Sequence, residues 1–365
     1  MMDVKNIEKA IVRYNGKIVG YLVELDGEIS FQYDDAWLLD GFSISPFSLP
    51  LSNKIYVNKK SNFGGLYGVF ANSLPDGWGE LLMIRRLALK GINYERLSPI
   101  TKLSLLGENA KGALTYEPTQ VETAGVTADL DEMALYAKEI LEGMAVSETE
   151  LDKMVSAMGS SGGARPKANV NSDGREWIVK FRGSFDSASC GNEEFSANQT
   201  AKECGLNVND FRLFPSKKGS GYFGAARFDR EGGKKIHMIS LSYLLETSFR
   251  LPNLDYMHLF KVVKQISRCE NDIYEAYGRM CFNVLYGNKD DHGNNFSFLY
   301  DESLHGYRLS PFYDITKTPN MGEHSMSVLG KENPDEDDLL EIGEAIRLPR
   351  HKCLAIIEKI KATIS

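Results

Sequence analysis

The first part of the chain alternates apolar and polar residues with the two-residue period of β-strands. Residues 11–25 form two such runs on either side of the pair Asn15-Gly16, which favours the tight turn of a β-hairpin. A third short strand is expected over residues 29–33. Residues 43–70 contain two prolines and a Gly-Gly pair, and they are expected to be mostly loop. The chain therefore opens with a β-rich region.

Helical periodicity takes over further along, where apolar residues recur every three or four positions. Ser147 and Glu150 fit a capping box at the start of one helix. A dense Gly/Ser loop, MGSSGGARPKANV, leads into the strand EWIVKF, and DFRLFP and GYFGAARFDR predict a strand pair. The helices predicted in this region cover residues 80–89, 130–144, 148–158 and 192–206.

The last third of the sequence is mainly helical. Between its helices, NFSFLYD and GYRLSPFYD predict a hairpin. Helices are expected at 254–267, 270–287, 335–346 and 350–363. With the polar stretch 120–131 as a boundary, these patterns predict three domains: a β-rich domain at 1–125, a mixed α/β domain at 126–235 and a helical domain at 236–365.

Composition narrows the functional classes. The 365 residues carry a net charge of −8, which argues against a broad nucleic-acid-binding face. The five cysteines are odd in number and have no CxxC spacing, so free thiols in a reducing cytoplasm are expected. No apolar run reaches the roughly 20 residues of a membrane span. We therefore expect a cytoplasmic protein without a membrane partner.

The most concentrated polar chemistry lies in GNKDDHGNNFSF, residues 287–298. Phosphoryl transfer uses a base for the attacking hydroxyl and oxygen ligands for Mg²⁺, and kinase catalytic loops space them as D-x-x-x-x-N. Asp290 and Asn295 have that spacing, whereas five residues after Asp291 lies Phe296. Asp314, after an apolar run, is placed like a second metal carboxylate. The alternative is that these polar side chains only cap a turn.

Further candidates lie upstream and within the same loop. Lys180 ends an apolar strand after the Gly-rich loop, as a phosphate-contacting lysine would, although many strand-end lysines are merely solvated. Glu193 or Glu194 could pair with it, or could complement a helix dipole. The Gly-rich loop could present N–H groups to phosphates or be a plain surface loop. His292 could assist catalysis or hydrogen-bond the loop backbone.

Taken in order, several motifs resemble the HipA family of bacterial toxin Ser/Thr kinases over nearly the whole chain. They are YNGKIVGYL, ISFQYDDAWL, SLPLS, NSLPDGWGE, LSLLGENAKGAL, SSGGARPK, IVKF, NEEF, RFDR, GNKDDHGNNFS and SPFYD. The resemblance implies an α+β, protein-kinase-like fold with a β-rich N-terminal subdomain, a mixed α/β N-lobe and an all-helical C-lobe.

The resemblance also implies a set of site residues and the cofactors ATP and Mg²⁺. Asp290 would be the catalytic base, and Asn295 and Asp314 would bind metal. Ser160 would be autophosphorylated, expelling the loop and inactivating the enzyme, and the adjacent Ser161 is the alternative target. Residues contacting the nucleotide would be Lys180, Phe228, Ser161, Gly162, Gly163, Ala164, His292, Asn295 and Asp314.

Partners follow from the same resemblance. Characterised family members phosphorylate aminoacyl-tRNA synthetases, halt translation and are held in check by a helix-turn-helix antitoxin (HipB-like) that binds operator DNA. Contact with DNA would then be indirect, through the antitoxin. The family usually has an acidic residue where this chain has Ala226, so adenine recognition would use backbone groups and Phe228. The alternatives are an antitoxin-bound co-repressor with weak catalysis, and a small-molecule or lipid kinase.

Overall fold

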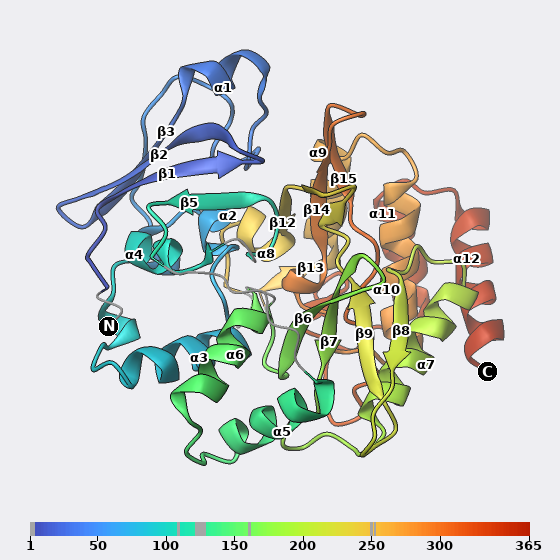
Figure 1. Cartoon of the computed structure of the whole chain (residues 1–365). Helices are drawn as coiled ribbons and strands as arrows, with labels where there is room; N and C mark the ends of the chain where they lie inside the picture. Colours follow the sequence, from blue (N-terminus) through green and yellow to red (C-terminus); the bar gives the residue numbers. More distant parts are fainter. Residues whose placement is uncertain (1–3, 108–109, 121–128, 160–161, 249–250, 252) are drawn as a thin grey trace. The chain divides into compact units, whose positions relative to one another are not determined.

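A computed structural model describes residues 4–107, 110–120, 129–159, 162–248, 251 and 253–365 (Figure 1). The chain divides into two compact units, which are described one at a time. Unit 1 comprises Met1–Gly191, Arg212–Ile239 and Tyr243–Glu246, and unit 2 comprises Asn192–Phe211, Ser240–Ser242 and Thr247–Ser365.

Unit 1 begins with a five-stranded antiparallel sheet in the order β4-β3-β2-β1-β5 (blue to teal in Figure 1). The predicted hairpin is confirmed, because Asn15 and Gly16 both have positive φ, as a type I′ turn requires. The strands are β1 (Lys9–Tyr14), β2 (Lys17–Leu25), β3 (Glu28–Tyr33), β4 (Tyr56–Asn58) and β5 (Leu114–Glu117).

Short helices fill the connections of this sheet. The helix predicted at 80–89 is α3, and it begins earlier, at Gly77, with Asp76 in the N-cap position. Two glycines in its first turn gave that turn the sequence character of a loop. The helical segments are α1 (Asp35–Asp40), η1 (Asn62–Gly65), α2 (Gly68–Ala71), α3 (Gly77–Ala88), η2 (Tyr94–Arg96) and α4 (Pro99–Ser104).

A second sheet in unit 1 has the order β6-β7-β9-β8. The helices α5 (Leu130–Leu141) and α6 (Glu148–Met158) and part of α3 share a buried core with it, built around Trp78, Met154 and Val179. The predicted capping box of α6 is present, with Ser147 and Glu150 bonded reciprocally. The strands are β6 (Lys167–Ser172), β7 (Arg175–Lys180), β8 (Phe211–Phe214) and β9 (Tyr222–Ala226), followed by the short pair β10 (Arg230–Glu231) and β11 (Lys234–Lys235).

The unit boundary falls within β12 (Met238–Ser240), which leads into α8 (Leu241–Leu244). Unit 2 is mainly helical, with the predicted hairpin of β14 and β15 among its helices. Tyr277, Phe282 and Ile357 are fully buried in its core. Its elements are α7 (Cys190–Glu203), β13 (Leu254–Asp255), α9 (Tyr256–Ile266), α10 (Asp272–Tyr286), η4 (Gly293–Asn295), β14 (Ser297–Asp301), β15 (Gly306–Leu309), β16 (Met326–Ser327), α11 (Glu336–Ala345) and α12 (Arg350–Ile364).

All five cysteines are free thiols, as their number and spacing predicted. Over the described ranges, no helix is both long enough and apolar enough to cross a bilayer.

Candidate active site

The acidic loop of unit 2 begins where α10 ends. Gly287 closes that helix in the left-handed conformation, with φ of 82°, and its N–H bonds the carbonyl of Asn283. Gly293 is required at the start of η4, because a Cβ there would collide with the Ser242 Oγ and lie 2.6 Å from Leu254 Cδ1. The loop therefore turns sharply against buried neighbours and does not extend freely into solvent.

Asp291 is the buried acid of this loop, with a side chain that is 0% exposed. Its Oδ2 accepts hydrogen bonds from the Tyr256 hydroxyl (2.7 Å) and pairs with His324 Nδ1 (2.8 Å). Its Oδ1 accepts from the backbone N–H of Ser325 (2.8 Å) and of Met326. Burial, and then the charge of Asp291, raise the pKa of Tyr256 well above its usual value, so the hydroxyl stays a donor. Asp291 therefore holds the loop against the segment 324–326.

Asp290 lies next to it in a different environment, with a side chain that is 48% exposed. His292 Nε2 lies 3.7 Å from its Oδ1. The side-chain amide of Asn295 donates to the Asp290 carbonyl at 2.7 Å, which leaves the amide oxygen of Asn295 as a candidate metal ligand. The fold thus holds Asp290 and Asn295 together across their predicted spacing.

Asp314 occupies a strained backbone position, with φ of 60° in the left-handed region. Its flanks are fixed. Phe312 exchanges backbone hydrogen bonds with the segment leaving α7, at Asn207 (2.7 Å) and Asn209 (2.9 Å). The side chain of Asn198 on α7 reaches the Ile315 carbonyl. Strain held by such surroundings is typical of functional positions.

Tyr313 links this corner to the acidic loop. Its hydroxyl donates to the Asn294 carbonyl at 2.5 Å and is also bonded to Ser297 Oγ. Each end of this link is one residue from a predicted metal ligand, Asn295 or Asp314. Carboxylate and amide oxygens suit Mg²⁺, which usually keeps few protein ligands and takes phosphate oxygens as well. The donor set fits that ion, and in the described parts of the chain no cluster of three or more His, Cys, Asp and Glu side chains offers a competing site.

The remaining predicted site residues belong to unit 1. Lys180 ends β7 opposite Lys167 of β6, and its ammonium lies 5.7 Å from the ring centroid of Phe223. In the Gly-rich loop, the N–H of Gly163 donates to Asp76 Oδ1, and Ala164 is exposed. Gly162 is half-buried. Ser160 and Ser161 lie outside the described residues.

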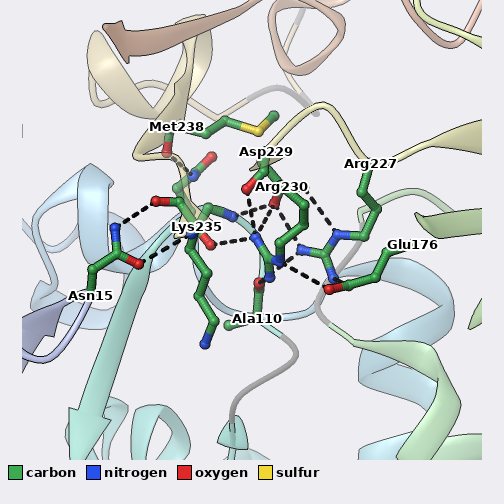
Figure 2. A network of polar contacts seen from close by, with 10 residues as sticks. Asn15, Ala110, Glu176, Arg227, Asp229, Arg230, Lys235 and Met238 are labelled. Atoms are coloured by element: carbon green, nitrogen blue, oxygen red, sulfur yellow. Dashed lines mark hydrogen bonds and ion pairs between the residues drawn. The ribbon is translucent and has the colours of Figure 1, made fainter. Parts of the chain in front are cut away.

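The segment after β9 carries a buried ionic network (Figure 2). Asp229 bonds Arg227 (2.8 Å) and Arg230 (3.0 Å), and both guanidinium groups also donate to the Ala110 carbonyl. Burial opposes ionisation of Asp229, but the two arginines and the Gly112 N–H outweigh it and lower its pKa to about 2. Phe228, between Arg227 and Asp229, is left partly exposed.

The sequence analysis did not single out Asp76 or Asp229, and it did not predict the structural role of Asp291. The signal for Asp229 was available, because an acid flanked by arginines two residues before it and one after it is suited to a buried ion network. Asp76 was signalled by the glycines on both sides of Trp78, which permit close backbone approach. For Asp291, nothing in the sequence distinguished a structural role from the role of the adjacent Asp290.

Residues 159–365 match the family model of the HipA-like C-terminal domain, and residues 10–117 match that of the HipA N-terminal domain. The chain belongs to the HipA family. The resemblance found in the sequence motifs is thereby confirmed.

Two relatives resemble the chain over most of its length. The chain is 25% identical to the serine/threonine-protein kinase toxin HipA of Shewanella oneidensis, over 93% of this chain and 85% of that one. It is also 25% identical to Y4mE of Sinorhizobium fredii, a protein provisionally named a kinase, over 88% of this chain and 80% of that one.

A solved structure supports the same fold. HipA of Shewanella oneidensis, in complex with HipB and operator DNA, superimposes with a TM-score of 0.72, covering 97% of this chain and 88% of that chain at 19% identity. This agreement confirms the predicted α+β, kinase-like fold.

Proposed function

We propose that this chain is a serine/threonine-protein kinase toxin of a type II toxin–antitoxin system that transfers the γ-phosphoryl group of ATP to a protein. The observation that carries the proposal is that the two adjacent acids lie in different environments. Asp290, at the D-x-x-x-x-N spacing, is accessible, whereas Asp291 is buried and bonded to neighbouring groups. A loop that only capped a turn would not need to expose one acid and bury the next.

The proposed roles follow from the chemistry of the groups. Asp290 accepts the proton of the substrate hydroxyl while the hydroxyl oxygen forms a bond to the γ-phosphorus of ATP. The bond between the γ-phosphorus and the bridging β,γ-oxygen breaks, and ADP leaves. Asn295 and Asp314 would hold Mg²⁺, which neutralises charge on the phosphates. Lys180 would contact the phosphates, and backbone groups near Phe228 would receive the adenine. The three-domain division at residues 125 and 235 is part of the same proposal.

The proposed partners are a HipB-like antitoxin and a protein substrate, of which an aminoacyl-tRNA synthetase is the first candidate. The related HipA of Shewanella oneidensis was solved with HipB and operator DNA, which supports an antitoxin partner here. The net charge of −8 favours indirect DNA contact through that partner. We further propose a cytoplasmic location and autophosphorylation on Ser160, with Ser161 as the neighbouring alternative.

The direct test is incubation of a panel of purified aminoacyl-tRNA synthetases with the chain, Mg²⁺ and γ-labelled ATP. Label should enter a Ser or Thr of one synthetase and should be absent with Asp290→Asn. A panel that stays unlabelled, with a chain that also fails to label itself, would reject the kinase proposal.

One observation favours a second candidate, a co-repressor with weak catalysis. Ala226, at the position where the family usually has an acid, is 1% exposed and offers adenine no side-chain acceptor. Growth after induced expression separates the two functions. A kinase toxin arrests growth, and Asp290→Asn relieves the arrest, whereas a co-repressor leaves growth unchanged in both cases.

A further inference from the structure

The segment Ser73–Leu74–Pro75–Asp76–Gly77–Trp78 has no part in the proposed chemistry, yet it makes specific contacts with the Gly-rich loop. Asp76 stands at the N-cap of α3, where an Asp side chain normally accepts a hydrogen bond from the first turn of its helix. Its side chain makes no such bond. Instead, Oδ1 accepts the N–H of Gly163 at 2.5 Å, and the residue is 9% exposed.

The same segment also holds the carbonyl of Gly163. The backbone N–H of Trp78 donates to that oxygen at 3.1 Å, and the indole of Trp78 is anchored in the core at 1% exposure. Both backbone groups of one loop residue are therefore bonded by residues 76 and 78. Contacts at both backbone groups fix the orientation of this residue as well as its position.

Two glycines make the approach possible. Gly77, with φ of +48°, lies so close that a Cβ there would sit 2.7 Å from the Gly163 oxygen and 2.9 Å from Ala164 Cα. Gly163 itself has φ of +98°, a conformation that L side chains rarely adopt. Both residues at this contact, Gly77 and Gly163, therefore need to be glycine.

Lys167 holds the loop from a second side. It is 5% exposed, and its ammonium donates to the Gly162 carbonyl. Lys111 contributes charge nearby: burial lowers its pKa, and the carboxylates of Asp76 and Asp229 oppose that effect. Lys167 therefore holds the loop residue next to the one that Asp76 and Trp78 bond.

We propose that Asp76 is a positioning residue that holds the Gly-rich loop, together with the Trp78 N–H and Lys167, in the conformation that receives the ATP phosphates. Glycine-rich backbone loses more conformational freedom on ordering than any other, so a loop left unrestrained would bind nucleotide weakly. In this conformation the Gly163 N–H is bonded to Asp76 and is not offered to phosphate. The kinetic consequence rests on the proposed kinase function, whereas the restraint itself does not.

Hydrogen–deuterium exchange on the full chain without nucleotide tests the restraint. In Asp76→Ala, peptides covering residues 162–166 should exchange about tenfold faster than in wild type, because a charge-assisted hydrogen bond is lost. Asp76→Asn keeps an acceptor oxygen and should fall between the two. Asp40→Ala, which removes an exposed carboxylate of the same unit, is the matched control and should leave these peptides unchanged. Should Asp76→Ala fail to fold, the Asn variant carries the comparison.

Unchanged exchange in a folded Asp76→Ala chain would overturn the restraint. The kinetic arm then separates positioning from a purely structural role: KM for ATP should rise about tenfold in Asp76→Ala with kcat changed far less. A KM that is unchanged or lower would overturn the positioning role. Wild type without any phosphotransfer would reject the kinase proposal, while the exchange result would still decide the restraint.

Discussion

Asp290 and Asp291 are adjacent in sequence and opposite in environment. The Asp291 carboxylate is 0% exposed and accepts from the Tyr256 hydroxyl and two backbone N–H groups, whereas that of Asp290 is 48% exposed. Because side chains of neighbouring residues diverge from the backbone, one acid can anchor the loop while the other faces outward. The structural role thus falls to Asp291, and the proposed chemical role falls to Asp290.

Substitution should separate these roles. Asp291→Ala leaves several buried donors without an acceptor, so the free energy of unfolding should fall by about 3–5 kcal/mol. Asp290→Ala should change it by about 0.5 kcal/mol or less, as expected of an exposed side chain. Urea denaturation of both variants measures the difference. Equal losses in the two would contradict the division of roles.

The Asp229 network should be a major source of stability in unit 1. Asp229→Ala leaves the Arg227 guanidinium, 3% exposed, without its closest carboxylate, and should cost about 3–5 kcal/mol. Glu176 contacts the same arginines from a position that is 39% exposed, so Glu176→Gln should cost about 1 kcal/mol or less. Thermal unfolding compares the two, and a Glu176→Gln chain as unstable as Asp229→Ala would refute the network as drawn in Figure 2.

His237 predicts a pH dependence. Burial lowers its pKa to about 4, against a partly opposing hydrogen bond to the Ile44 carbonyl. Between pH 6.5 and 4 the unfolded chain binds a proton that the folded chain does not. The free energy of unfolding is therefore unaffected by the titration of His237 above pH 6.5, and it falls on acidification by up to about 3 kcal/mol.

The measurement is urea denaturation of wild type and His237→Gln at pH 7 and pH 5. The wild type should lose more stability over this interval than the variant, because only the wild type carries the titrating ring. Parallel losses would show that His237 is not held neutral.

Asp314 combines a predicted metal role with a left-handed backbone. Asp314→Asn should preserve stability, because Asn tolerates positive φ as well as Asp does. It removes the charge expected to bind Mg²⁺, so Mg²⁺ should no longer strengthen ATP binding, which calorimetry with and without the metal can measure. Retention of the full Mg²⁺ effect in the variant would remove Asp314 from the metal site.

Much of the fold could be predicted from local patterns. The Asn15-Gly16 turn needs only two residues that tolerate positive φ, and the capping box at Ser147 is likewise local. The start of α3 at Gly77 was not predictable in this way. Gly77 is explained by the approach of Gly163, which is distant in the sequence.

The candidate site shows the same limit. Spacing selected Asp290 and Asn295, and the structure adds the amide–carbonyl bond that joins them. The sequence could not reveal that Asp291 is bonded to His324 and Ser325, because those contacts depend on how the chain folds back. The contact between Asp76 and Gly163 is hidden for the same reason.

The most direct test of the central claim is intact-mass analysis of the purified chain after incubation with Mg²⁺ and ATP, alone and with a synthetase panel. The wild type should add phosphate to itself or to a synthetase, and Asp290→Asn should do so at least about 100-fold more slowly. A wild-type chain that transfers no phosphate and behaves like Asp290→Asn would contradict the kinase assignment.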